Sequence, residues 1–302
     1  MTLTLSNPLA VSAAGFSELC EGPVWDPRLD RLYWVDIVRG HLHWLDAEAR
    51  KRSTLELPAP LGFVVLTDNP DILVAGIASS LAYVELSSNR VNYFAALESP
   101  HAALRCNDGK CDPAGRLWAG TMPTGSGGAL GALYSIDAGR SPKRRLSDVG
   151  CSNGLAWNPD RHEFYFIDST ARRIDRFRWD RANGTLGAPF TLASFPDDYG
   201  LPDGMCIDSD GNLWVAFWDG GCVRQIHGRT GETLTTVHLP VRRVTSCTFG
   251  GRDLATLFIS TALEGLSSSE RSAQPLAGSV FTVHPGSRGL PPNLFPAPSA
   301  IP

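Results

Sequence analysis

Four side chains with oxygen donors recur at one position of a repeat in the sequence: Glu21, Asn107, Asn153 and Asp203. Two carboxylates and two amides carry the charge that a divalent cation neutralises. Oxygen donors alone favour hard ions such as Ca²⁺, Mg²⁺ or Mn²⁺, with Zn²⁺ or Fe²⁺ as alternatives. Three or four protein ligands leave room for water and substrate, so the set predicts one divalent, catalytic metal ion.

Turn formation is the competing explanation for these residues, because Asn-Gly and Asp-Gly pairs favour turns. The segment LPDGMCIDSDGNLWVAF contains two such pairs, which begin at Asp203 and Asp210. Only Asp203 stands at the shared repeat position, whereas Asp210 lies in the turn before the next strand. Glu21 is not a turn former, so turns alone do not explain the set. Asp203 is predicted as a metal ligand and as the catalytic residue that assists proton transfer, with a role as ligand and orienter alone as the alternative. Asp210 is predicted as a turn residue.

Short strands are the elements that must bring these side chains together. Runs rich in β-branched and aromatic residues, bounded by Gly, Pro, Asp and Asn, recur along the chain. Long segments with apolar residues at helical spacing are hard to find. The runs align on six anchor residues, spaced 40 to 49 residues apart: Tyr33, Leu73, Trp118, Tyr165, Trp214 and Phe258. Units of that length, with three or four strands each, are typical of β-propeller blades.

We therefore predict an all-β, six-bladed β-propeller that forms a single domain over residues 1–302. A strand within residues 2–12 is expected to close the ring against the last blade. The Pro-rich tail, 285–302, is expected to wrap the surface or to be partly disordered. The glycine-rich segment 123–131 suits either a mobile loop over the channel mouth or an ordinary hairpin loop.

Rotational symmetry gathers equivalent positions of successive blades at one level of the central channel. The four oxygen donors stand 11 or 12 residues before their anchors and are expected to meet there. The same count in the other two blades reaches Leu61-Gly62 and Ser246-Cys247, which are poor or weaker ligands. Arg105 lies two residues before Asn107 on an extended strand and should point to the same site, where it would stabilise an oxyanion or a carboxylate product. A packing arginine is the alternative.

Composition excludes several classes of function. The formal charge is −4 and no basic stripe is present, so nucleic acid is not an expected partner. No run of 18 apolar residues and no basic signal region occur, so we expect a cytoplasmic protein without a membrane segment.

Seven cysteines without a CxxC motif are expected to be free thiols. No GxSxG motif occurs and no histidine falls at the ligand position, which disfavours a serine esterase. His41 and His43 are expected on an exposed hairpin.

Five segments carry a resemblance to a known family. They are CEGPVWDPRLDRLYWVDI, RCNDGKCDPAGRLWAGTM, SNGLAWNPDRHEFYFIDS, LPDGMCIDSDGNLWVAFWDGG and VTSCTFGGRDLATLFIST. The sequence resembles the senescence-marker-protein, gluconolactonase and regucalcin-like family of six-bladed propellers, from about residue 15 to 265.

The resemblance implies a divalent-metal-dependent hydrolase whose partner is a small-molecule sugar lactone. It implies that Glu21, Asn153 and Asp203 bind the metal, that Arg105 binds substrate and that Asn107 contacts substrate or a metal-bound water. Attack of metal-activated water on the metal-polarised carbonyl would yield the aldonic acid. The protein is expected to be a monomer or a weak homo-oligomer.

Two other functions stay open at this point. One is a phosphotriesterase-like or arylesterase-like metal hydrolase, which a bulky aromatic pocket wall would favour. The other is a non-catalytic propeller that binds calcium or serves as an interaction platform. Carboxylates at the level of the channel argue against a platform, because such a protein needs no ionisable groups on its axis.

Overall fold

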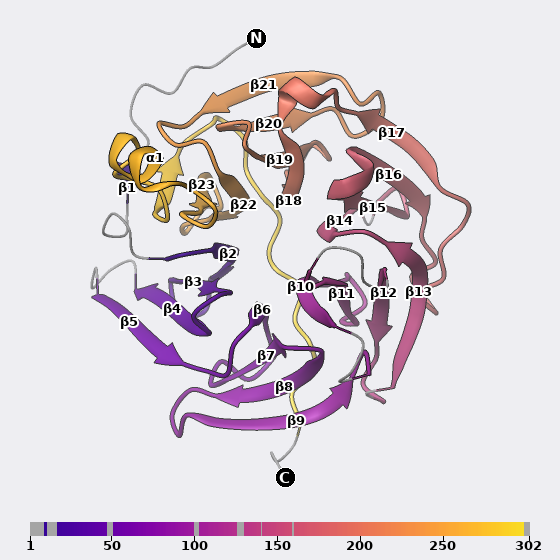
Figure 1. The fold of residues 1–302 in the computed structure, drawn as a ribbon. Coiled ribbons are helices and arrows are strands. Elements are labelled where there is room, and N and C mark those ends of the chain that lie inside the picture. Colours follow the sequence, from indigo (N-terminus) through magenta and orange to yellow (C-terminus); the bar gives the residue numbers. More distant parts are fainter. Residues whose placement is uncertain are drawn as a thin grey trace.

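Six four-stranded antiparallel sheets surround a central axis, as the ribbon in Figure 1 shows. The computed structural model describes residues 9–10, 17–46, 51–99, 103–125, 130–139, 141–158 and 160–298. The predicted all-β, six-bladed propeller is confirmed. Residues 126–129 of the glycine-rich segment lie outside the described residues.

Each blade runs from an innermost strand at the axis to an outermost strand at the rim. The innermost strands are β2 (Cys20–Asp26), β6 (Leu61–Leu66), β10 (Leu104–Cys111), β14 (Ser152–Asn158), β18 (Leu201–Ile207) and β22 (Val244–Gly250). The second strands are β3 (Arg31–Asp36), β7 (Ile72–Ile77), β11 (Leu117–Pro123), β15 (Glu163–Asp168), β19 (Leu213–Trp218) and β23 (Thr256–Thr261). The third strands are β4 (His41–Asp46), β8 (Ser80–Glu85), β12 (Gly131–Ile136), β16 (Arg173–Arg178), β20 (Cys222–Ile226) and β24 (Val280–Val283). The outermost strands are β5 (Lys51–Glu56), β9 (Arg90–Ala96), β13 (Pro142–Val149), β17 (Phe190–Ser194), β21 (Thr233–His238) and β1 (Leu9–Ala10).

The ring closes through pairing of β1 with β24, in which Leu9 lies opposite Thr282 and Ala10 opposite Phe281. The last blade therefore takes its outermost strand from the N-terminal segment, as predicted. The rest of the predicted strand, residues 2–8 and 11–12, lies outside the described residues.

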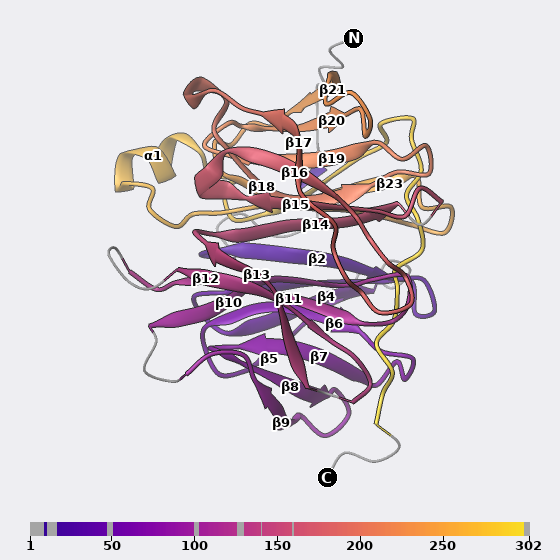
Figure 2. The same ribbon diagram turned by 90° about the vertical axis from the view of Figure 1, so that its right-hand side faces the viewer.

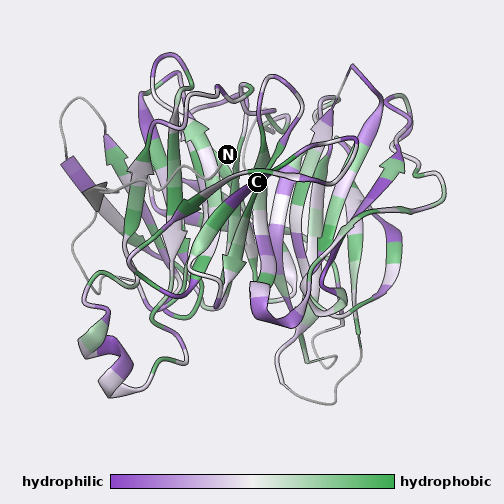
Figure 3. Cartoon of the chain, turned by 90° about the horizontal axis from the view of Figure 1, so that it is seen from above, coloured by the Kyte–Doolittle hydropathy of each residue, from purple (hydrophilic) through white to green (hydrophobic). Residues whose placement is uncertain are grey.

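All six anchors lie buried in the second strands, where they fill the space between neighbouring blades. Two of them are also tied to the turn that precedes them. The indole Nε1 of Trp118 donates to Asp112 at 2.9 Å, and that of Trp214 donates to Asp208 at 3.0 Å. Figure 3 shows that the hydrophobic residues are concentrated in the strands.

Every innermost strand carries an irregularity in its pairing at the repeat position of the oxygen donors. The irregularities fall between Glu21 and Val24, Leu61 and Phe63, Cys106 and Gly109, Asn153 and Leu155, Pro202 and Met205, and Val244 and Ser246. A bulge bends the strand and redirects side chains.

Glycines at the bulges let neighbouring inner strands approach each other. A Cβ on Gly154 would lie 2.8 Å from the carbonyl oxygen of Asp203 in the next blade. The Asn153-Gly154 and Asp203-Gly204 pairs thus lie within strands, not in turns.

The Pro-rich tail does wrap, but across the channel and not over the outer surface. We call Ser287–Phe295 the strap. The amide of Ser209 donates to the carbonyl of Arg288 at 2.8 Å in blade five, and Phe295 pairs with Thr67 in blade two. Figure 1 shows this yellow segment crossing the centre of the ring. Residues 299–302 lie outside the described residues.

The expectation of an exposed setting is wrong for His43. Its side chain is fully buried, its ring lies 5.5 Å from that of Trp34, and its Nδ1 lies 2.8 Å from the hydroxyl of Thr54. Burial lowers the pKa of His43 to about 3, and the charge of His41 adds to the effect. The alternating pattern of the hairpin does not reveal which face packs against the neighbouring strands.

The helical content is small. Helix α1 (Ser268–Ala273) begins with a capping box between Ser267 and Glu270, and two short 3₁₀ helices span Ser169–Ala171 and Asp197–Tyr199. Among the described residues, no helix has the length and apolar character needed to cross a bilayer. All seven cysteines are free thiols, as expected.

Candidate metal centre

A pocket of about 190 Å³ lies at one end of the channel, where the innermost strands begin. It is lined by all five predicted site residues: Glu21 from β2, Arg105 and Asn107 from β10, Asn153 from β14 and Asp203 from β18. No residue of β6 or β22 lines it. The repeat position therefore gathers side chains that are far apart in the sequence.

A hydrogen-bond network fixes both amide side chains. Arg105 Nη1 donates to Asn107 Oδ1 at 2.7 Å, and Asn107 Nδ2 donates to Asn153 Oδ1 at 3.1 Å. Asn153 Nδ2 donates to Ser169 Oγ at 2.9 Å, and that hydroxyl donates to the carbonyl of Pro202 at 2.6 Å. The side-chain oxygen Oδ1 of Asn153 therefore faces Asn107, and it keeps a second lone pair that can bind a metal ion.

Burial disfavours the ionised form of two of the carboxylates that line the pocket. Burial raises the pKa of Glu21 to about 8, with the charge of Asp108 adding to the effect. Burial, followed by the charges of Glu21 and Asp108, raises the pKa of Asp203 well above its ordinary value. Arg105 favours the charged form of both, yet it does not offset their burial.

These residues fit a divalent cation. A cation beside Glu21 and Asp203 removes the repulsion between them, and the oriented carbonyl oxygen of Asn153 supplies a neutral third donor. Within the described ranges no three His, Cys, Asp or Glu side chains are grouped to hold a metal ion. The candidate set mixes carboxylates with an amide, so it does not depend on such a group.

Sequence reasoning missed a second ring of lining residues, made of Ile37, Met122, Ser169 and Trp218. A signal for them exists, because each lies four residues after its anchor, at or just beyond the end of a second strand. Cys151 lies two residues before Asn153, the position that Arg105 has before Asn107, whereas Glu264 has no such regular position.

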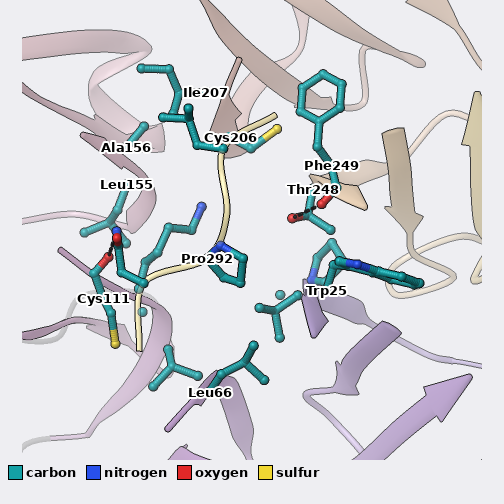
Figure 4. Close-up of a pocket in the computed structure, with 18 of the residues that line it drawn as sticks. Trp25, Leu66, Cys111, Leu155, Ala156, Cys206, Ile207, Thr248, Phe249 and Pro292 are labelled. Carbon is teal, nitrogen blue, oxygen red and sulfur yellow. Dashed lines mark hydrogen bonds between the residues drawn. The ribbon is translucent and has the colours of Figure 1, made fainter. Parts of the chain in front are cut away.

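Asp108 is a further residue that the sequence did not single out. It follows Asn107 within the bulge of β10 and lines a separate cavity of about 380 Å³ further along the channel. Figure 4 shows that cavity, with Trp25, Leu66 and Leu155 around it and Pro292 of the strap among them. Asp108 therefore adds negative charge near the pocket from the other side of the bulge.

Residues 19–263 match the family model described as SMP-30/Gluconolactonase/LRE-like region. The chain belongs to this family. Regucalcin of Gallus gallus is 36% identical over 283 residues, which cover 92% of this chain and 94% of the relative. The "Putative sugar lactone lactonase YvrE" of Bacillus subtilis (strain 168) is 35% identical over 277 residues, with coverage of 91% and 94%.

The family's fold is also found among solved structures. A calcium-binding protein, regucalcin, from Agrobacterium tumefaciens superposes with a TM-score of 0.92 at 23% identity, covering 98% of this chain and all of that one. At this identity the similarity concerns the fold, and it agrees with the six-bladed arrangement.

Proposed function

We propose that the protein is a divalent-metal-dependent hydrolase that opens a sugar lactone to the aldonic acid. The observation that carries the proposal is the convergence of Glu21, Asn153, Asp203, Asn107 and Arg105 on one small pocket. Family membership supports the reaction class, since one relative is named as a sugar lactone lactonase and the family name includes gluconolactonase.

In the proposed site, Glu21, Asn153 and Asp203 hold the metal ion. When bound, a divalent ion polarises a carbonyl and lowers the pKa of water. The overall reaction adds water to the lactone carbonyl carbon, breaks the ring C–O bond and leaves a carboxylic acid and a hydroxyl group.

The chain's own residues orient the substrate and handle the proton. Arg105 has its Nη1 beside Asn107, where its guanidinium can stabilise negative charge that develops on the carbonyl oxygen. Asp203 is buried in the pocket, and a bound cation would stabilise its ionised form, which can accept a proton from a neighbouring water. It is thus our candidate for taking the proton of the attacking water, in addition to binding the ion.

The walls of the pocket separate this proposal from the aryl-ester alternative. Trp218 is the one aromatic residue among those lining the pocket, and the other apolar ones are Leu19, Ile37, Met122 and Leu201. A single indole does not form an aromatic cage around an aryl group. The polar side chains of Glu21, Arg105 and Asn107 can instead form hydrogen bonds with the hydroxyl groups of a sugar ring.

Calcium binding without hydrolysis is the second candidate, because the Agrobacterium tumefaciens regucalcin is described as a calcium-binding protein. Both candidates use the same acidic residues. They differ in whether a lactone is consumed.

The test follows acid release from an aldonolactone before and after complete chelation. Activity should disappear with the metal and return when Ca²⁺, Zn²⁺, Mn²⁺, Mg²⁺ or Fe²⁺ is added back one at a time. Asp203→Ala should lower kcat/KM by about a thousandfold. Asp210→Ala is the matched control and should retain activity. Full activity after chelation would contradict the metal mechanism, and metal binding without any hydrolysis would favour the second candidate.

A further inference from the structure

A carboxylate that has no hydrogen-bond or ion-pair partner among the described residues lies at the rim of the pocket. Glu264 lines the pocket and is exposed to solvent. Within the described ranges its side chain accepts no hydrogen bond and forms no ion pair. The negative charge of such a carboxylate can act on a charged molecule that enters the pocket.

The backbone around Glu264 is held in place. The amides of Leu263 and Glu264 both donate to the carbonyl of Glu18 at 2.8 Å, and the buried side chains of Leu263 and Leu266 flank the turn. Gly265 adopts a left-handed φ of 68°, which reverses the chain there. The carboxylate therefore projects from a fixed turn.

The residues that line the pocket have no net positive charge, even when one divalent cation is bound. Arg105 is the one basic residue among those lining the pocket, which also include the carboxylates of Glu21, Asp203 and Glu264. One arginine and one divalent cation balance those three carboxylates. An anionic substituent on the substrate finds no unpaired cation among these residues, and it meets Glu264 at the mouth.

Arginines close to the rim already pair with a carboxylate. Arg243 stacks on Trp218 with its guanidinium carbon 4.8 Å from the ring centroid, and its Nε lies 3.1 Å from Asp219. Arg242 lies 3.0 Å from the same carboxylate. Arg243 also lies against the turn that carries Glu264, since a Cβ on Gly265 would lie 2.4 Å from its Nη1, but no ion pair joins Arg243 to Glu264.

We propose that Glu264 is a specificity-determining residue that excludes lactones carrying a carboxylate or phosphate group and restricts the site to neutral sugar lactones. This inference rests on the proposed lactone hydrolysis. It concerns selection among substrates, whereas the hydrolysis itself depends on Glu21, Asn153 and Asp203.

The experiment compares a neutral aldonolactone with the matched aldarolactone, whose terminal CH₂OH group is replaced by a carboxylate. Glu264→Gln should raise the ratio of kcat/KM for the anionic over the neutral lactone by about tenfold, because one like charge is removed at short range. The change should appear mainly in KM and should shrink in about 0.5 M NaCl, because salt screens charges at the rim. Glu264→Lys should raise the ratio further.

Glu56→Gln is the matched control, because Glu56 is an exposed carboxylate on the outermost strand β5. It should leave the ratio unchanged. A ratio in Glu264→Gln equal to that of the unaltered protein, or an equal change for both lactones, would overturn the proposal.

A binding measurement keeps this inference separate from the reaction. Calorimetric titration with a neutral anhydroalditol and with its carboxylate analogue, neither of which can be hydrolysed, should show the same tenfold shift in relative affinity in Glu264→Gln. If no lactone is hydrolysed but the shift is found, the proposed reaction fails and the charge selection stands. If hydrolysis is found without the shift, the charge selection fails alone.

Discussion

Glu21 and Asp203 occupy positions at which charge is unfavourable for the folded chain alone. Their raised pKa values mean that folding disfavours the ionised carboxylates. A divalent cation reverses this effect, since it stabilises the charged forms that burial disfavours. Metal binding and stability are therefore expected to be linked at these two residues.

Replacing Glu21 with glutamine should stabilise the metal-free protein and abolish its response to metal. With the pKa of Glu21 at about 8 in the folded chain, this group must take up a proton on folding at neutral pH, which costs about 3 kcal/mol that glutamine avoids. Denaturant unfolding with and without a chelator measures both effects.

The unaltered protein should gain stability when metal is added, and Glu21→Gln should not. Ser53→Ala on β5 serves as a control away from the channel and should keep the metal response. An equal metal-induced gain in Glu21→Gln and in the unaltered protein would exclude Glu21 as a ligand.

The residues of the pocket were predictable where they follow the repeat. The four oxygen donors lie 11 or 12 residues before their anchors, and rotational symmetry brings such equivalent positions close together in space. Glu264 was not predictable in this way. It lies in a turn outside the repeat, and the conformation of that turn depends on contacts with Glu18, which is distant in the sequence.

Among the elements, the innermost strands show that one dipeptide pattern can occur in two kinds of local structure. Asn-Gly and Asp-Gly suit a tight turn, and they also suit a bulge at which neighbouring backbones approach. Asp203-Gly204 lies in such a bulge within β18, and Asp210-Gly211 lies in the turn that follows. Composition does not distinguish the two, but distance from the anchor does.

The turn before β19 is held by Asp208 and not by Asp210. Asp208 is buried and accepts hydrogen bonds from the backbone of Asp210 and Asn212 and from the side chains of Trp214 and Gln225. Asp210 is exposed, and in the described part of the chain its carboxylate has no hydrogen-bond partner. The sequence indicated a turn here but not which aspartate stabilises it.

Asp208→Ala should therefore lower the free energy of unfolding by about 3 kcal/mol, because it leaves the buried donors of Trp214 and Gln225 unpaired. Asp210→Ala, two residues away, should change it by less than about 0.5 kcal/mol. Urea denaturation of both variants measures the difference. Equal losses would show that the turn depends on Asp210 as well.

At the scale of the whole molecule, the two ends of the channel differ. The candidate metal centre lies at the end where the innermost strands begin, and the strap lines the cavity further along the channel. Figure 2 shows α1 on the left side of the molecule and the yellow C-terminal segment on the right. The tail's composition predicted neither its path nor its burial. Two of its contacts join residues that are 79 and 228 positions apart in the sequence, Ser209 with Arg288 and Thr67 with Phe295.

The strap should stabilise the ring through Phe295. The phenyl ring of Phe295 is fully buried in the apolar cluster that blades two and three share. Its centroid lies 6.4 Å from that of the Phe94 ring, and the two rings are stacked. Phe295→Ala should reduce the free energy of unfolding by about 3–5 kcal/mol, since it removes a large side chain from a packed core. Leu290→Ala on the same strap, where Leu290 is 38% exposed, should cost less than about 1 kcal/mol.

Both variants should retain the kcat of lactone hydrolysis at a temperature where they are folded, because neither residue lines the pocket of the candidate metal centre. Denaturant titration gives the stabilities, and acid release gives the rates. If Phe295→Ala unfolds no more easily than Leu290→Ala, the strap is a passive cover of the channel and blades two and three hold together without it.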